Sequence, residues 1–375
     1  MKRIRSEEGG VAALVAIFVS AGIFLTAIAL SVDSGVLYLE RRVVDNAAQA
    51  AALALARECA QNTTTCPTSR VPQEISNRNS PDSATRITEL CVNGKTALGN
   101  PCQSSTGTSI DCGAVPSSVK QYARIRTETQ NPDQSAGTST FFSNGKVLTL
   151  IGCAQAQWGN ATSASSFSIF AVSICEWARQ QSGLRVIAEF NTNTGTSDCT
   201  YTFTDYAGQT FTRSGINGWG ALDLLSASLP ADARASAQCP NPAVDRPAYL
   251  RIGYTLNQIT RDQSSSNYCG NSNLSSKIGV WLNQTLYIPL VSTQKLQGNA
   301  TVHTVEAFAA FKFLGYSLLK GSGSSSDIGG TYPSGNWCPK NTNCIYGEFI
   351  RTISPGSEVG NNGGPQLGLQ AIELF

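Results

Sequence analysis

Twelve cysteines occur in this 375-residue sequence, and disulfide formation is the chemistry that they predict. Zinc sites commonly place cysteines in Cys-x-x-Cys pairs, and the sequence contains no such pair. The number is even, and every cysteine follows the apolar N-terminal segment, as expected of a chain that folds outside the reducing cytosol. The disulfide candidates are Cys59, Cys66, Cys91, Cys102, Cys112, Cys153, Cys175, Cys199, Cys239, Cys269, Cys338 and Cys344.

The spacing of the cysteines leaves their connectivity open, because many pairings are compatible with one sequence. Pairs that are near in sequence would close local loops and restrict the unfolded chain. The local pairings that we consider are Cys59 with Cys66, Cys102 with Cys112, Cys239 with Cys269, and Cys338 with Cys344.

Catalytic residues are scarce by comparison. His303 is the single histidine, whereas triads and most hydrolytic metal sites need a histidine beside its partners. His303 precedes an apolar run, which favours a place on the face of a strand. Asp262 opens an Asp-x-Ser-x-Ser sequence typical of metal-ion adhesion sites, but the residues before it are too polar for a buried strand. Residues 321–326 lack the Lys-Ser/Thr ending of a phosphate loop. We predict no enzyme activity, no cofactor and no metal site.

Composition argues for an exported protein with an uncharged surface. Only 14% of the residues are charged and the formal net charge is +2, so nothing indicates a nucleic-acid partner. Ser, Thr, Asn, Gln and Gly take the place of the missing charges, which suits a β-rich extracytoplasmic domain better than a cytosolic enzyme.

The N-terminal segment must position everything that follows, and it reads as a membrane anchor. The run from Val11 to Val32 carries no charge and is long enough to cross a bilayer as a helix. Basic residues within 2–5 favour a cytoplasmic N-terminus, although Arg41 and Arg42 on the far side argue the other way. The cysteines favour an exported C-terminal part, because disulfides persist outside the reducing cytosol. We therefore predict a single-pass protein of the cytoplasmic membrane.

A cleaved signal peptide is the alternative, with Ala27 to Ala29 as an Ala-x-Ala cleavage site. The apolar run is longer than a signal peptide requires and continues past that site. We favour an anchor that stays uncleaved or is trimmed near Gly10.

The helix should continue beyond the membrane, because residues 34–59 contain no proline and are rich in alanine. A single helix of about 48 residues and about 70 Å is expected, with roughly half of it outside the bilayer core. Small residues recur at a spacing of four and would let helices approach closely, although an alanine-rich helix also shows such spacing by chance. These residues are Ala12, Ala16, Ser20, Ala27, Ser31, Gly35, Ala48, Ala52 and Ala56. Asp33 is expected to mark the membrane boundary, with its carboxylate in headgroup water.

The order of these features is specific: a Gly9-Gly10 start, the apolar span, Val-Asp-x-Gly-x-x-Tyr over residues 32–38, the basic pair, and an Asn-Ala-Ala-x-Ala-Ala-Ala-Leu-Ala tail over residues 46–54. It resembles the N-terminal module of the TadE/TadG-like pilus-assembly proteins of Flp (tight-adherence) systems. Further segments are similar to the larger members of that family in high-GC Gram-positive bacteria. These segments are 154–159, 174–177 (Ile-Cys-Glu-Trp), 286–290, 306–316 and 344–349.

The resemblance implies a minor pilin or pilin-like assembly factor that primes, caps or lends adhesion to a filament. Its partners would be the membrane, other pilins and pilus-assembly membrane proteins through the helix, and a surface ligand. Val15 stands where processed prepilins usually carry Glu, counting from a cut after Gly10. The alternative is a permanently anchored envelope receptor for a glycan or protein. The residues implied in helix packing and assembly are Asp33, Gly35, Tyr38, Arg41, Arg42, Ala48 and Ala52.

The expected fold is α+β, with a pilin-like N-terminal helix followed by a mostly antiparallel, disulfide-bonded β region. We divide the chain into an anchor (1–58), a Cys-rich segment that ends in strands (59–160) and a β-rich C-terminal domain (161–375). Residues 218–229 could form a short helix, and Asn144-Gly145 is a turn signal. The expected strands are 146–151, 153–158, 167–175, 185–190, 199–204, 280–291, 302–319, 347–353 and 367–375. A helix is the alternative for residues 302–319.

Overall fold

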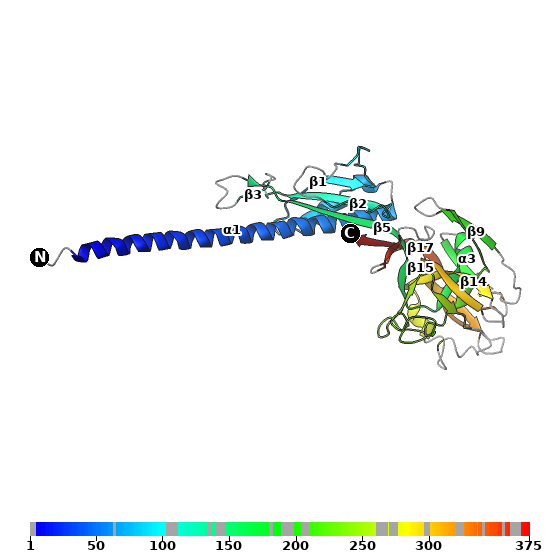
Figure 1. Ribbon diagram of the computed structural model, residues 1–375. Coiled ribbons are helices and arrows are strands. Elements are labelled where there is room, and N and C mark those ends of the chain that lie inside the picture. Colours follow the sequence, from blue (N-terminus) through cyan, green and yellow to red (C-terminus); the bar gives the residue numbers. More distant parts are fainter. Residues whose placement is uncertain are drawn as a thin grey trace.

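The computed structural model confirms an α+β chain with one long apolar N-terminal helix, a β-rich remainder and several disulfides (Figure 1). Of residues 5–15 only the backbone conformation is described. The described residues are 5–62, 65–102, 112–131, 133, 135, 137–139, 147–179, 183–188, 199–204, 210–215, 217–259, 269, 277–295, 301–319, 326–335, 337–339, 342–354, 357–360 and 369–375.

Helix α1 spans Arg5–Gln61 and is 57 residues long, or about 86 Å at the usual rise per residue. It is longer than the sequence predicted, because it begins within the polar N-terminal segment. Figure 1 shows its N-terminal half extending away from the rest of the chain and its C-terminal half lying along a sheet.

That sheet is built from both ends of the β-rich region. Its strand order is β1-β2-β5-β20-β18, and β19 also pairs with β5. All pairings are antiparallel except the short parallel pairing of β18 with β20. The last strand of the chain therefore returns to a sheet whose other main strands precede residue 162. The strands are β1 (Thr85–Val92), β2 (Tyr122–Thr129), β5 (Ile151–Ala161), β18 (Thr352–Ile353), β19 (Val359–Gly360) and β20 (Leu369–Leu374).

The second sheet has eight strands in the order β11-β7-β14-β15-β17-β8, with β13 and β16 also paired to β15. Only β7 and β14 run parallel, over two residue pairs. Phe170 lies at the centre of its core, 5.0 Å from the ring of Trp219 and 5.6 Å from that of Trp281. The strands are β7 (Phe170–Ser173), β8 (Gly183–Ala188), β11 (Trp219–Ala221), β13 (Thr255–Asn257), β14 (Thr285–Lys295), β15 (Thr301–Leu319), β16 (Ser326–Gly330) and β17 (Cys344–Ile350).

The remaining described elements are short helices and two-stranded ribbons. The ribbons pair β3 (Thr138–Ser139) with β4 (Val147–Leu148), β6 (Ser163–Ser166) with β12 (Ala248–Arg251), and β9 (Cys199–Thr204) with β10 (Thr210–Gly215). The helices are η1 (Cys66–Thr68), α2 (Val71–Arg78), α3 (Ile174–Arg179) and η4 (Gly279–Trp281).

Most of the predicted strands are confirmed, including the two long apolar runs that form β14 and β15. The predicted helix over 218–229 is wrong: Gly218 has a φ of 119°, and residues 219–221 pair with β7 as strand β11. The segment after Cys59 has more structure than expected, because α2 and β1 both lie within it. The predicted Asn144-Gly145 turn and the sequences 262–266 and 321–325 lie outside the described residues.

Five disulfides are described, and three of the four local pairings are confirmed: Cys59–Cys66, Cys239–Cys269 and Cys338–Cys344. The pairing of Cys102 with Cys112 is wrong, since Cys102 bonds Cys91 and Cys112 bonds Cys153. The cause is tertiary: Cys91 on β1 and Cys153 on β5 flank the same stretch of β2, and each bonds one of the two cysteines in the segment between β1 and β2. Cys175 is also disulfide-bonded, and no described cysteine is free.

Candidate functional site

The N-terminal half of α1 exposes an unbroken apolar surface. Among the described residues, α1 is the one helix long and apolar enough to cross a membrane. Nine large apolar side chains between positions 17 and 32 are each more than half exposed. They are Ile17, Phe18, Val19, Ile23, Phe24, Leu25, Ile28, Leu30 and Val32.

The polar side chains between positions 16 and 32 are satisfied within the helix. Ser20 donates a hydrogen bond to the carbonyl of Ile17 at 3.0 Å, and Thr26 donates to the carbonyl of Gly22 at 2.8 Å. Ser31 donates to the carbonyl of Ala27 at 2.8 Å. Hydroxyls bonded in this way do not need water, so the surface behaves as apolar over its whole circumference. Among the predicted span residues, Ala16 is exposed, whereas the side chains of Val11 and Ala12 are not described. The possible cleavage position Gly10 also lies in the part of the helix where only the backbone is described.

The C-terminal half of α1 is buried against the first sheet of the same chain. Ala48, Ala52 and Leu55 are completely buried, and they pack with Ile125 of β2 and Trp158 of β5. Small side chains on the helix allow close approach of the sheet, as small residues do at other helix interfaces. Ala48 and Ala52 were predicted to pack against other helices, but they pack against the sheet of the same chain, and their buried side chains are not available to a neighbouring helix.

The closest approach of helix and sheet occurs at Val44. The hydroxyl of Thr127 in β2 donates to the Val44 carbonyl oxygen at 3.0 Å, and Thr127 is completely buried. Gly152 at the start of β5 lies over the same carbonyl, and a Cβ there would be 2.7 Å from its oxygen. Only glycine allows the strand to come this near, which is a recurrent use of glycine within strands. Neither residue stands out in the sequence as a functional position.

The remaining predicted assembly residues lie on the helical turns of α1 between its exposed N-terminal half and its buried C-terminal half. Gly35 is exposed, and Tyr38 is 57% exposed. Arg41 forms an ion pair with Asp45 at 3.0 Å, and the guanidinium of Arg42 lies 5.0 Å from the ring centre of Tyr38. These side chains remain at the surface, where a partner can reach them.

Asp33 differs from the expectation. Its neighbours Val32 and Ser34 are exposed, but Asp33 is only 8% exposed and is not without a partner. The folded chain covers this side of the helix. The carboxylate is therefore withdrawn from the water that a boundary residue would reach.

The opposite face of the first sheet carries buried charge. Arg124 of β2 donates to Glu89 of β1 at 2.9 Å, and Arg126 lies 3.9 Å from the same carboxylate. All three side chains are less than 10% exposed. Paired charges at this depth depend on one another, because a single buried ion would be strongly destabilising.

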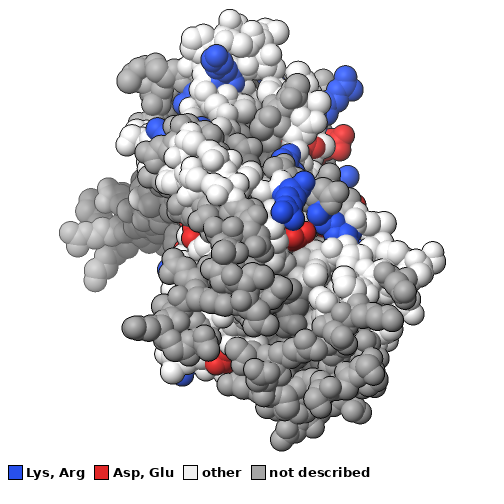
Figure 2. All heavy atoms as spheres, turned by 90° about the vertical axis from the view of Figure 1, so that its right-hand side faces the viewer, with Lys and Arg blue, Asp and Glu red and all other residues white. Residues whose placement is uncertain are grey.

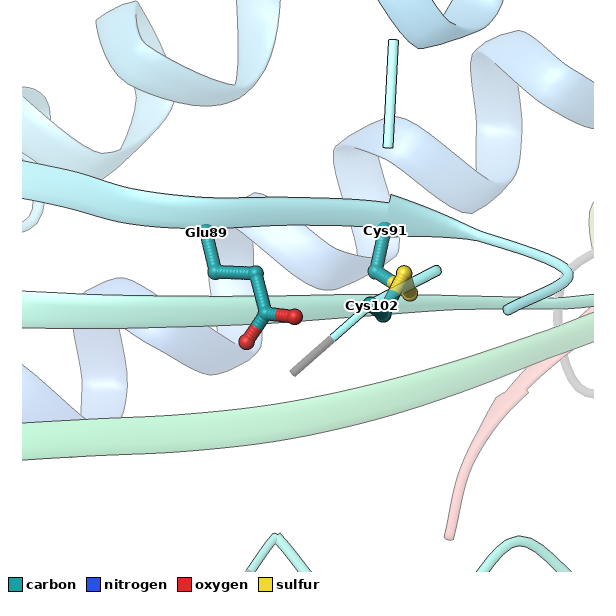
Figure 3. Close-up of side chains that lie close together, drawn as sticks. All are labelled: Glu89, Cys91 and Cys102. Carbon is teal, nitrogen blue, oxygen red and sulfur yellow. A yellow bond between two sulfur atoms is a disulfide. The ribbon is translucent and has the colours of Figure 1, made fainter. Parts of the chain in front are cut away.

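Glu89 also lies beside Cys91 and Cys102, and these three form the one group of potential metal ligands among the described residues (Figure 3). Figure 3 shows Glu89 and Cys91 on the same side of β1, with Cys102 next to Cys91. The two sulfurs are joined in a disulfide, whereas metals bind the thiolate form. The group is therefore an ion pair packed beside a disulfide.

His303 lies in β15, opposite Leu256 of β13 and Thr293 of β14, and is completely buried. Burial lowers its pKa to about 3, because the charged imidazolium is poorly solvated there. The ring is neutral near pH 7 and has no access to solvent. This placement agrees with the predicted strand-face histidine.

Comparison of the chain with protein-family models, curated proteins and solved structures found no match. The function is therefore inferred from the geometry of α1 and its sheet, together with the sequence resemblance given above.

Proposed function

We propose that this protein is a minor pilin or pilin-like assembly factor of a Flp/Tad-type pilus. The observation that carries the proposal is the division of α1 into a bare apolar half and a half held by the first sheet. The bare half needs an apolar environment supplied by something other than this chain. The other half needs none, because the sheet already covers it.

The size of the exposed surface supports insertion into lipid. Burial of a large aliphatic or aromatic side chain contributes about 1.5–3 kcal/mol, so the nine exposed residues represent on the order of 10–30 kcal/mol. That amount is comparable to the whole stability of a typical domain, about 5–15 kcal/mol. The bare half is therefore expected to reside in a bilayer, or among similar helices in a filament.

The orientation follows from charge and redox chemistry. Basic residues at positions 2–5 favour a cytoplasmic N-terminus, and disulfides persist outside the cytosol. The helix would place both sheets on the outer side of the membrane. If the helix leaves the membrane, its apolar surface must be buried by other helices, which is the arrangement of a filament core.

Mass spectrometry of filaments sheared from the cell surface tests the proposal, provided that it includes the N-terminal peptide of this chain. A processed minor pilin would appear in the filament fraction with a peptide that begins near Val11. A non-filamentous assembly factor would remain in the membrane fraction with residues 2–5 intact, and deletion of its gene would abolish piliation.

The rival is a permanently anchored receptor for a glycan or protein, which shares the same helix. It predicts membrane retention and normal piliation after deletion. That pair of results would refute the pilus proposal.

A further inference from the structure

Three aromatic rings form a ladder from a buried position on β17 to the surface, in and after the segment that joins β16 to β17. Tyr346 in β17 is 8% exposed, Trp337 is partly buried, and Tyr332 is 45% exposed. The rings of Trp337 and Tyr346 are 6.1 Å apart, and those of Trp337 and Tyr332 are 5.6 Å apart with an interplanar angle of 22°. The ladder thus ends in an aromatic ring that faces solvent.

The ladder is held by covalent and hydrogen-bonded restraints. The Cys338–Cys344 disulfide joins the residue after Trp337 to the first residue of β17. The amide of Trp337 donates to the carbonyl of Gly335 at 3.0 Å, and Gly335 has a φ of 92° that favours glycine. The rings are therefore positioned before any ligand arrives, which reduces the entropic cost of binding.

The sequence next to the rings is polar and almost uncharged. Between positions 328 and 347 the sequence has one charged residue, Lys340, which lies outside the described residues. Thr331 and Ser334 are exposed next to the rings in sequence and offer hydroxyls. Figure 2 views the molecule from the side that faces right in Figure 1, and there the described atoms are mostly white, with few blue and red atoms among them. Such surroundings suit a neutral, hydroxyl-rich ligand better than a phosphate or an acidic peptide.

We propose that Tyr332 and Trp337 form a binding surface for a neutral saccharide of β-linked pyranose units. Such a sugar has a flat face of C–H groups that can pack on an aromatic ring, while its hydroxyls bond polar groups at the rim. Tyr332 and Trp337 are too close for a ligand to enter between them, so the outer ring face is the contact. A proline-rich peptide instead docks in grooves between aromatic side chains. The ladder offers a platform and no such groove.

This proposal stands on the ring geometry and not on the filament assignment, since a membrane-retained chain would present the same rings. The full-length protein in lipid nanodiscs is titrated calorimetrically with cellohexaose, chitohexaose and decaproline. Nanodiscs are used because sugar-headed detergents would compete. We expect at least one hexasaccharide to bind, and Tyr332→Ala to weaken that binding roughly tenfold or more. Tyr332→Phe keeps the ring face and should bind within about threefold of the wild type.

Phe375→Ala is the matched control, because Phe375 is a 40% exposed aromatic residue next to the first sheet and should not affect binding. Tyr332 is exposed, so its substitution leaves the core intact, and an unchanged unfolding midpoint verifies this. Trp337→Phe tests the second ring while an aromatic side chain remains at this position. The proposal is overturned if neither saccharide binds, if decaproline alone binds, or if Tyr332→Ala binds the saccharide as tightly as the wild type.

Discussion

The hydroxyl of Thr127 donates a hydrogen bond to the carbonyl oxygen of Val44, so a strand is bonded directly to the middle of the long helix. Gly152 leaves room for this contact from the neighbouring strand. The pair marks the place where α1 changes from a free helix into one face of a folded core. The N-terminal half leaves its apolar side chains exposed, whereas the C-terminal half packs against the first sheet of the same chain.

Gly152→Ala should destabilise the first sheet by about 1–3 kcal/mol, because its methyl group would overlap the Val44 carbonyl. Thr127→Val should cost about 1 kcal/mol through the lost hydrogen bond. Urea denaturation of the full chain measures both. Gly279→Ala is the control, since a Cβ there meets nothing within 4 Å. Equal stability of the Gly152 and Gly279 variants would show that helix and strand are not in close contact.

Glu89→Gln should destabilise the protein by about 3–5 kcal/mol, because it removes one partner of a buried ion pair and leaves Arg124 poorly compensated. The matched control is Glu358→Gln, which breaks a pair with Arg251 whose side chains are 48% and 51% exposed. Exposed pairs contribute at most about 1 kcal/mol. Chemical denaturation of both variants gives the comparison, and similar losses would mean that the Glu89 pair is effectively solvated.

Removal of the Cys112–Cys153 disulfide should cost about 4 kcal/mol, and removal of Cys338–Cys344 about 2 kcal/mol, because the first closes a much longer loop in the unfolded chain. The sequence separations are 41 and 6 residues. Paired serine substitutions, with free-thiol counts and denaturation curves, test the order. The reverse order would show that native-state packing outweighs loop closure at these bonds.

Stability should fall as the pH is lowered below about 6.5, because the unfolded chain then protonates His303 while the folded chain does not. The pKa of His303 in the folded chain is about 3, below the ordinary value of 6.5. Stability is therefore lost progressively between pH 6.5 and pH 3, and this residue causes no loss above pH 6.5. Because of this residue, the free energy of unfolding should decrease by about 1.4 kcal/mol for each pH unit within this range. Denaturation between pH 7.5 and 5 measures it, and His303→Gln should flatten the curve. An imidazole NMR signal that titrates near pH 6.5 in the folded protein would contradict the prediction.

Charge reversal at Arg41 and Arg42 should reduce piliation while the fold is kept, because both side chains lie at the surface of α1. Ala52→Leu should also reduce piliation, but through overpacking of the buried helix face at about 1–3 kcal/mol. Filament yield and the unfolding midpoint, measured together, separate the two effects. Normal filaments in the arginine variant would remove these residues from the assembly surface.

The features that could be predicted from the sequence are those that depend on composition and local pattern. The uncharged run from Val11 to Val32 predicted an apolar helix, and alanine content predicted its continuation past residue 34, since both are properties of neighbouring residues. The apolar runs 280–291 and 302–319 predicted buried strands, with a helix as the alternative for the second, and they contain β14 and β15. Of the four local cysteine pairings considered from spacing, three are confirmed: Cys59–Cys66, Cys239–Cys269 and Cys338–Cys344.

The contacts between distant segments could not be predicted from the sequence, because they form only when the chain folds. The return of β20 to β5, the Cys112–Cys153 bond and the contact of Thr127 with Val44 each join residues that no local pattern relates. The same holds for the burial of Ala48 and Ala52, because a small-residue spacing is equally suited to a neighbouring helix and to the chain's own sheet. The choice between these partners depends on which apolar surface folding brings within reach, and here that surface is the face of β2 and β5.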